Sequence, residues 1–119
     1  MFHDLLLANE WYVSQFSLGD LEPKASRGLA VVTCIDSRIE PLAMLGLVPG
    51  DAKILRNGGG RVTDDVLRTL VLAVHLLGVE RVMVIHHTGC AMAETDEDTL
   101  RRAIEAASGL SAAGWDFHP

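Results

Sequence analysis

Two cysteines and a pair of adjacent histidines are the residues of this sequence whose types and spacing could bind a metal ion. Cys34 ends the apolar run LAVVTC, and His87 and Cys90 are spaced H-x-x-C in the segment VIHHTGC. A zinc site that performs chemistry needs three protein ligands and one open position, and thiolate and imidazole are suitable donors. The sequence therefore predicts a metal site formed by Cys34, His87 and Cys90.

Other interpretations of the same residues stay open. His87 is favoured over His86 because it has the three-residue spacing to Cys90, whereas His86 would point to the opposite face of a continuing strand. A single buried cysteine is more often a small hydrophobic residue, and a histidine at a strand end is more often hydrogen-bonded at the surface. The two cysteines could also pair, although in a reducing compartment metal-binding or catalytic thiols are the better expectation.

Asp36 and Arg38 follow Cys34 closely in the segment VVTCIDSR. Residues two apart in an extended chain share a face, so this carboxylate and guanidinium can pair. Without a metal, the pair would be an ordinary loop salt bridge. Beside a metal, a carboxylate held by a guanidinium can accept a hydrogen bond from metal-bound water or, if released, occupy the open position itself.

Three consecutive glycines lie in the segment RNGGGR, which covers residues 56–61. The segment is similar to a phosphate-binding loop, but the pattern G-x-G-x-x-G is absent and the chain is acidic overall. Close packing of the backbone beside the predicted site is therefore the favoured use of these glycines.

The pattern along the chain predicts how these residues are brought together. Short apolar strands alternate with amphipathic helices, which is typical of an α/β fold with a parallel sheet and right-handed crossovers. With the strand order 2-1-3, the first and third strands are neighbours, so Cys34 and the turn at 86–90 meet at the carboxyl ends. The predicted strands are 29–34, 52–57 and 80–87, and the predicted helices are 2–16, a short one from Pro41, 63–78 and 95–109.

Two details of the helices can be tested against a structure. The helix after the glycines is predicted to be capped by Thr63 or Asp64 and to end at Gly78, and the last helix is predicted to be capped by Thr95 and to end at Gly109. The apolar stripe expected on the first of these helices consists of Val66, Leu67, Leu70, Val71, Val74 and Leu77.

Composition limits the classes of function. The chain has 119 residues, 49% of them hydrophobic, and a formal net charge of −6. One domain, covering residues 1–119, is expected at this length. Scattered basic residues argue against nucleic acid as a partner. The early apolar run LLLA is too short for a signal sequence or membrane span, so we expect a soluble, cytoplasmic protein without a membrane partner.

The motifs Cys34-x-Asp36-x-Arg38, RNGGGRVTDDVLR and VIHHTGC together resemble the β-class carbonic anhydrases from about residue 29 to about residue 105. The resemblance implies that Cys34, His87 and Cys90 hold Zn²⁺. It further implies reversible hydration of CO2 to bicarbonate by metal-bound hydroxide, with a lyase activity. Asp36, held by Arg38, would orient the hydroxide, and backbone amides near Gly58 and Gly59 would line the substrate pocket.

The resemblance also implies a homodimer or a larger homo-oligomer. Residues 1–27 would form an N-terminal helix and loop that pack on a partner subunit, which suits a helix with apolar residues on most faces. The chain stops 29 residues after Cys90 (119 minus 90), so it resembles a C-terminally abbreviated member with one sheet edge to be covered. Alternative functions are a carbonyl sulfide or carbon disulfide hydrolase, a non-catalytic zinc-stabilised module and a thiol redox sensor.

Overall fold

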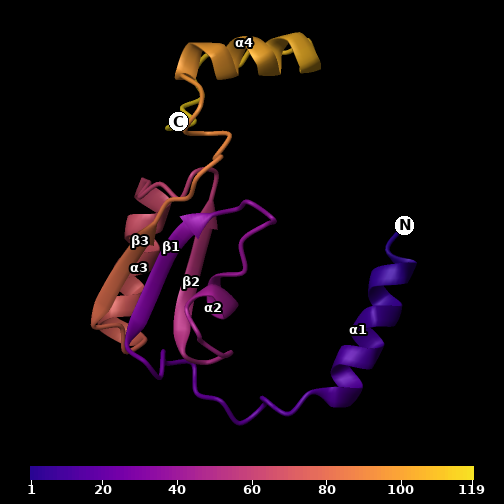
Figure 1. Cartoon of the computed structure of the whole chain (residues 1–119), viewed down its shortest axis with the longest axis vertical. Helices are drawn as coiled ribbons and strands as arrows, with labels where there is room; N and C mark the ends of the chain where they lie inside the picture. The colour runs from indigo at the N-terminus through magenta and orange to yellow at the C-terminus, as the bar shows by residue number, and fades with distance from the viewer.

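A sheet of three parallel strands forms the centre of the protein in the computed structural model, which describes residues 1–119 (Figure 1). β1 (Leu29–Cys34) lies between β2 (Ala52–Asn57) and β3 (Arg81–Ile85). The order β2-β1-β3 is the predicted one. The register pairs Cys34 with Asn57 and Thr33 with Ile85, so the carboxyl ends of the three strands lie at one edge.

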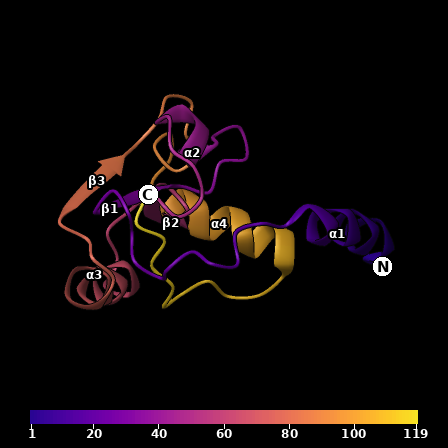
Figure 2. The ribbon, with the colours of Figure 1, turned by 90° about the horizontal axis from the view of Figure 1, so that it is seen from below.

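Helices cover both faces of this sheet. α2 (Pro41–Met44) and α3 (Asp64–Leu76) lie on opposite sides of it (Figure 2). All six residues of β1 are buried, which confirms the expectation of a strand covered on both faces. The core consists of Leu29, Val31 and Leu47 on the α2 side and of Ala25, Ala30, Ala73 and Val79 on the α3 side.

The helix ends follow the expected capping chemistry, with one correction. Thr63 caps α3, and its hydroxyl accepts a hydrogen bond from the Val66 N–H. α4 (Glu97–Ser108) is capped by Asp96, whose carboxylate accepts the Thr99 N–H at 2.8 Å, so the prediction of Thr95 is wrong. The carboxylate also places a negative charge at the positive end of the helix, which a threonine cannot do. α4 ends as predicted at Gly109, in the left-handed conformation.

The apolar stripe predicted for α3 is only partly buried. Val66 and Ala73 face the core, whereas Leu67, Val71 and Val74 are 50%, 58% and 45% exposed. The predicted stripe consists of two adjacent apolar faces of the helix, and the sheet beside α3 covers only one of them. α3 therefore presents a second apolar face to its surroundings.

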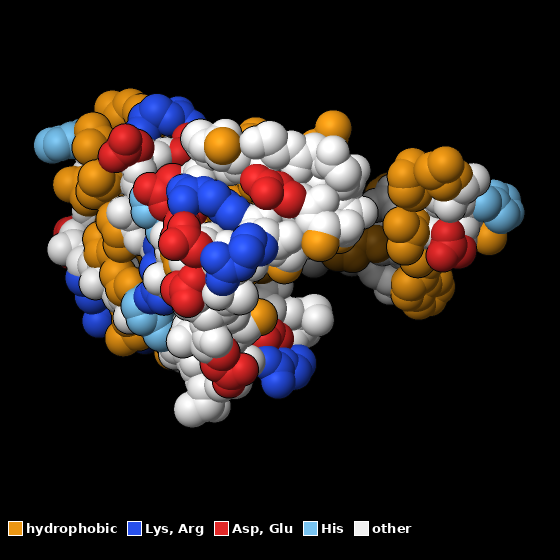
Figure 3. Space-filling view, turned by 90° about the horizontal axis from the view of Figure 1, so that it is seen from above, with side chains coloured by type: hydrophobic (Ala, Val, Ile, Leu, Met, Phe, Trp, Pro, Cys, Tyr) orange, Lys and Arg blue, Asp and Glu red, His pale blue; other side chains and the backbone are white.

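α1 (His3–Gln15) and α4 stand away from the sheet. α1 has no buried residue and extends from one side of the body, while α4 lies beyond the carboxyl ends of the strands (Figures 1 and 2). Seen from above, hydrophobic side chains gather on the projecting α1, while a cluster of charged side chains lies near the middle of the body (Figure 3). β3 is an edge strand whose residues 81–84 are exposed. None of the helices combines the length and the apolar character needed to cross a membrane.

Candidate metal centre

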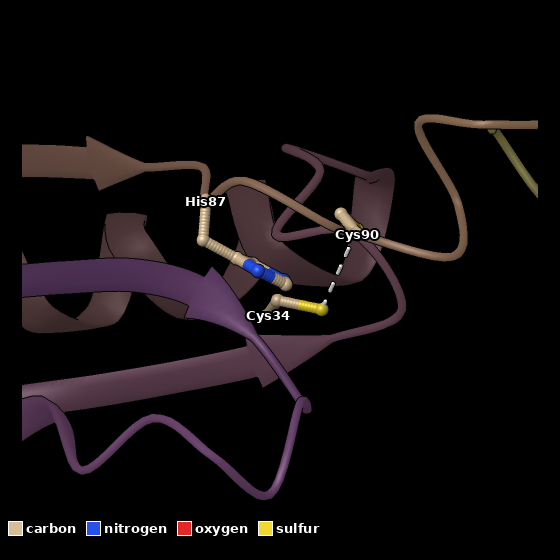
Figure 4. A group of neighbouring side chains, drawn as sticks. All are labelled: Cys34, His87 and Cys90. Carbon is tan, nitrogen blue, oxygen red and sulfur yellow. Dashed lines mark hydrogen bonds between the residues drawn. The ribbon is translucent and has the colours of Figure 1, made fainter.

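Cys34, His87 and Cys90 converge at the carboxyl edge of the sheet (Figure 4). Their ligand atoms all lie within 4.8 Å of one another, and the two Sγ atoms are 3.9 Å apart. Both cysteines are free thiols and are 5% exposed. Two thiolates on one tetrahedral zinc ion are separated by roughly 3.8 Å, given Zn–S bonds of about 2.3 Å. The observed separation therefore suits a shared zinc ion, as the spacing of the three residues predicts.

The orientation of His87 provides a separate test of this fit. Nδ1 lies 2.9 Å from the Thr88 carbonyl oxygen, so the ring nitrogen donates there and leaves Nε2 with a free lone pair. Nε2 is buried and has no hydrogen-bond partner. A buried polar atom without a partner is costly, and here it lies beside two thiols. The residues present thus fit a metal ion, and their donor set suits Zn²⁺.

The Cys34 thiol lies in surroundings that favour the thiolate. Burial raises the pKa of this thiol, but the neighbouring His87 imidazole and the Gly59 N–H outweigh it and lower the pKa to about 7. The Gly59 N–H donates to Sγ at 3.3 Å. The same contact with Cys34, together with the Thr88 carbonyl, raises the pKa of His87. A metal ion binds the thiolate and the neutral imidazole, so a divalent cation at this cluster would take the place of the proton that stabilises the Cys34 thiolate in its absence.

Asp36 and Arg38 form the predicted pair. Arg38 donates from Nε to Oδ1 at 2.9 Å and from Nη2 to Oδ2 at 2.5 Å, and its backbone N–H also donates to Oδ1. These bonds hold the pKa of the Asp36 carboxyl well below its usual range. Arg38 is itself held by the Gly89 carbonyl, at 3.1 Å. Asp36 Oδ2 lies 3.8 Å from His87 Nε2, so the carboxylate reaches the edge of the metal cluster.

The glycine segment packs against β1, as predicted. A Cβ on Gly60 would lie 2.9 Å from the backbone carbon of Thr33, and its φ of +66° also favours glycine. Gly58 lines a small cavity beside the thiols, whereas the N–H of Gly59 is engaged by Cys34 Sγ. This cavity has a volume of about 220 Å³ and is lined by Cys34, Ile35, Asp36, Gly58, Cys90, Ala91 and Met92.

His86 lies outside the cluster, as the spacing argument predicts. Its ring approaches the Arg61 guanidinium, with Nε2 and Nη1 3.4 Å apart. Arg61 also donates to the carbonyl of His118. The first histidine of the HH pair thus lies beside Arg61, outside the Cys-His-Cys cluster, and contributes to a surface network.

Sequence reasoning missed Arg56, Asn57 and Met92. Arg56 donates to the carbonyls of the loop after β1, and Asn57 bonds to both the N–H and the carbonyl of Arg61, which closes the glycine turn. Met92 lies against Gly58 and Gly59. Arg56 and Asn57 directly precede three glycines, and this position could have indicated that they hold the turn. Nothing in the sequence around Met92 indicates its place beside the glycines.

A doubly wound parallel sheet with a Cys-His-Cys cluster at its switch point defines a metal-binding α/β protein. Residues 29–110 match the family model for carbonic anhydrase. The chain is 39% identical over 107 residues to β-carbonic anhydrase 1 of Mycobacterium tuberculosis, an alignment that covers 90% of this chain and 65% of that protein. The chain therefore belongs to the β-carbonic anhydrase family.

A solved structure and a second group of relatives extend this result. The carbonic anhydrase of Streptococcus mutans superposes with a TM-score of 0.92 at 39% identity, covering 99% of this chain and 71% of that one. A carbon disulfide hydrolase of Acidianus is 43% identical over 67 residues, which cover 56% of this chain and 33% of that protein. The chain spans less than two thirds of the length of the mycobacterial relative.

Proposed function

We propose that this protein catalyses the reversible hydration of CO2 to bicarbonate, with Zn²⁺ held by Cys34, His87 and Cys90. The observation that carries the proposal is the buried, unpartnered Nε2 of His87 beside two thiols 3.9 Å apart. Bound zinc would lower the pKa of a water molecule toward 7 and so supply a nucleophile at neutral pH. Membership of the β-carbonic anhydrase family supports the choice of CO2 as substrate.

The protein's own residues have separate tasks in this proposal. Asp36 is held as an ionised carboxylate by Arg38 and acts as a hydrogen-bond acceptor that orients the nucleophile at the edge of the cluster. The Gly59 N–H stabilises charge on Cys34 Sγ. CO2 is small and apolar, which suits the cavity lined by Ile35, Gly58 and Met92. The reaction converts CO2 and water to bicarbonate and a proton, and the proton passes to buffer.

Carbon disulfide hydrolysis is the second candidate function. It is favoured by the 43% identity to the Acidianus carbon disulfide hydrolase over a segment of 67 residues. CS2 and CO2 are both linear molecules attacked at a central carbon, so the same ligand set could serve either. Access to the cavity beside Gly58 and Met92 would separate the two substrates.

The proposal includes a homodimer in which residues 1–27 pack on the partner subunit. α1 supports it because the helix buries none of its apolar residues within its own chain. A helix with apolar residues on most of its faces is expected to pack inside a protein or in an interface. We place the protein in the cytoplasm, because a reducing compartment keeps Cys34 and Cys90 as the thiols that metal binding requires.

The test is stopped-flow CO2 hydration on protein whose zinc content is measured in the same preparation. About one zinc per chain, with a hydration rate well above buffer that rises with pH, is the expected result. Full zinc with no CO2 hydration, but with release of sulfide from CS2, would favour the second function. Full zinc with neither activity would identify a zinc-stabilised module, and absent zinc would reject the ligand assignment.

A further inference from the structure

Arg56 holds the loop that follows β1 by three hydrogen bonds to its backbone. Nε donates to the Cys34 carbonyl at 2.8 Å, and Nη2 donates to the carbonyls of Asp36 at 2.8 Å and Ile39 at 3.3 Å. Arg56 is the penultimate residue of β2, so its guanidinium reaches across the carboxyl end of β1. The Arg56 side chain thus contacts both ends of the loop, at Cys34 and Ile39, and also the backbone of Asp36.

This loop has little other support from the sheet. The last contact between β2 and the loop backbone is the Ile35 N–H, which donates to the Asn57 carbonyl at 2.9 Å. Beyond Ile35 the chain turns, with the Ile39 N–H donating back to the Asp36 carbonyl at 3.1 Å. Carbonyls beyond a strand end lack sheet partners, and the planar fork of a guanidinium can donate to several of them at once. Arg56 is the side chain that serves them here.

The position of Asp36 depends on this loop. Its Oδ2 is paired with Arg38 but lies only 3.8 Å from His87 Nε2. A backbone shift of about 1 Å would therefore change which partner the carboxylate meets, and functional groups must be held within about 0.5 Å of their productive positions. Arg56 donates a hydrogen bond to the backbone carbonyl of Asp36 and so restrains the residue that carries this carboxylate.

We propose that Arg56 is a positioning residue that keeps the Asp36 carboxylate on Arg38 and away from the metal cluster. The inference rests on the proposed function, because it assumes a metal ion held by Cys34, His87 and Cys90. Arg56 is not one of the residues that line the cavity, and its hydrogen bonds to Cys34 and Asp36 are to their backbone carbonyls, so it acts through the backbone of the loop. Its loss should free the carboxylate to compete with small ligands for the metal.

The test uses Co²⁺ in place of zinc, because its visible absorption reports the ligands of the metal. Azide is titrated into Co²⁺-loaded wild type, Arg56→Lys and Arg56→Ala. The matched control is Arg68→Ala, since Arg68 is an exposed arginine on α3 whose bonds are to Asp65. We expect the dissociation constant for azide to rise about 10- to 100-fold in the Arg56 variants and to stay unchanged in the control. Arg56→Lys keeps the positive charge but lacks the planar, forked donors of a guanidinium. It is the variant to be measured if Arg56→Ala does not fold.

A measurement without metal separates positioning from a general loss of structure. In metal-free protein, hydrogen exchange of the Ile39 N–H should quicken in Arg56→Lys but not in the control, while exchange within β1 stays slow. Azide affinity within about twofold of wild type in both Arg56 variants would overturn this inference alone. Wild-type protein that gives no thiolate-to-cobalt absorption band would overturn the proposed function, and this inference with it.

Discussion

At the scale of single residues, the orientation of His87 turns two buried thiols into a metal site. The Thr88 carbonyl fixes which ring nitrogen carries the proton, so the other nitrogen faces Cys34 and Cys90 with a free lone pair. His86 is one residue away along the chain, yet its ring lies beside Arg61. Two adjacent residues of the same type are thus in different chemical environments, which provides a matched pair of variants.

Substitution of these two histidines should have opposite results. His87→Ala removes one of three donors, so the zinc content of the purified protein should fall well below one per chain, with metal affinity reduced at least about 10-fold. His86→Ala should retain about one zinc per chain and most of the CO2 hydration rate. Zinc analysis and a competitive chelator titration on both variants provide the measurement. Zinc loss in His86→Ala with retention in His87→Ala would reverse the assignment.

The Cys34 thiol gives the metal-free protein a pH-dependent stability. Its pKa falls from an ordinary value of 9.0 to about 7 on folding, so the folded state favours the thiolate more than the unfolded state does. The resulting stabilisation is complete above the unfolded pKa and is lost as the pH falls through about 7. Urea unfolding of metal-free protein should therefore become harder between neutral and alkaline pH, and Cys34→Ser should flatten this rise. An unchanged slope in Cys34→Ser would contradict the assignment.

At the scale of the elements, the glycine turn after β2 must lie directly on β1 for the site to form. Gly60 and Gly46 both have positive φ angles, +66° and +68°, but only Gly60 has backbone atoms of β1 within contact distance of a Cβ. Alanine variants at these two glycines therefore separate two contributions to the free energy of unfolding: the strain of a positive φ and the steric clash of an added Cβ with β1. The first cost is roughly 1 kcal/mol for an alanine at either position.

Gly60→Ala should therefore destabilise the protein more than Gly46→Ala. The added methyl group would lie 2.9 Å from the Thr33 backbone, and overpacking of this kind costs about 1–3 kcal/mol beyond the conformational term. Urea denaturation of the two variants at the same pH measures the difference. Because the turn also carries the Gly59 N–H, Gly60→Ala should weaken zinc binding while Gly46→Ala should not. Equal free energies of unfolding would refute the close-packing argument.

The elements themselves were largely predictable from sequence. Turn residues and apolar runs indicate β1 and β2, and the alternation of strands with helices indicates a parallel sheet. The observed order β2-β1-β3 was predicted because it is common in doubly wound sheets, not because the alternation requires it. The same local signals could not decide between Thr95 and Asp96 as the cap of α4, because both are good capping residues. They also could not tell which apolar face of α3 meets the sheet, since that depends on tertiary packing. The role of Arg56 was not predictable for a related reason, because the backbone carbonyls to which it donates lie 17 to 22 residues away in the sequence.

At the scale of the whole molecule, the exposed apolar surface is divided among three elements. α1 presents apolar side chains on most of its faces, α3 presents its second apolar face, and β3 leaves an exposed edge. Monomeric soluble proteins rarely leave large contiguous apolar patches uncovered. Among these surfaces, α1 is the one that projects furthest from the body, and so it is the best placed to reach a second copy (Figure 1).

The proposed dimer can be tested on α1 without disturbing the metal site. Trp11 is 69% exposed in the single chain, and tryptophan is a frequent anchor of protein interfaces. Trp11→Glu should raise the dimer dissociation constant at least about 30-fold, measured by analytical ultracentrifugation, with zinc content unchanged. Asn9→Glu is the control, because it adds the same charge to the same helix on nearly the opposite side, two residues away. If α1 packs on a partner through Trp11, only Trp11→Glu gives monomers, and dimers that persist in both variants would locate the interface on α3 or β3 instead.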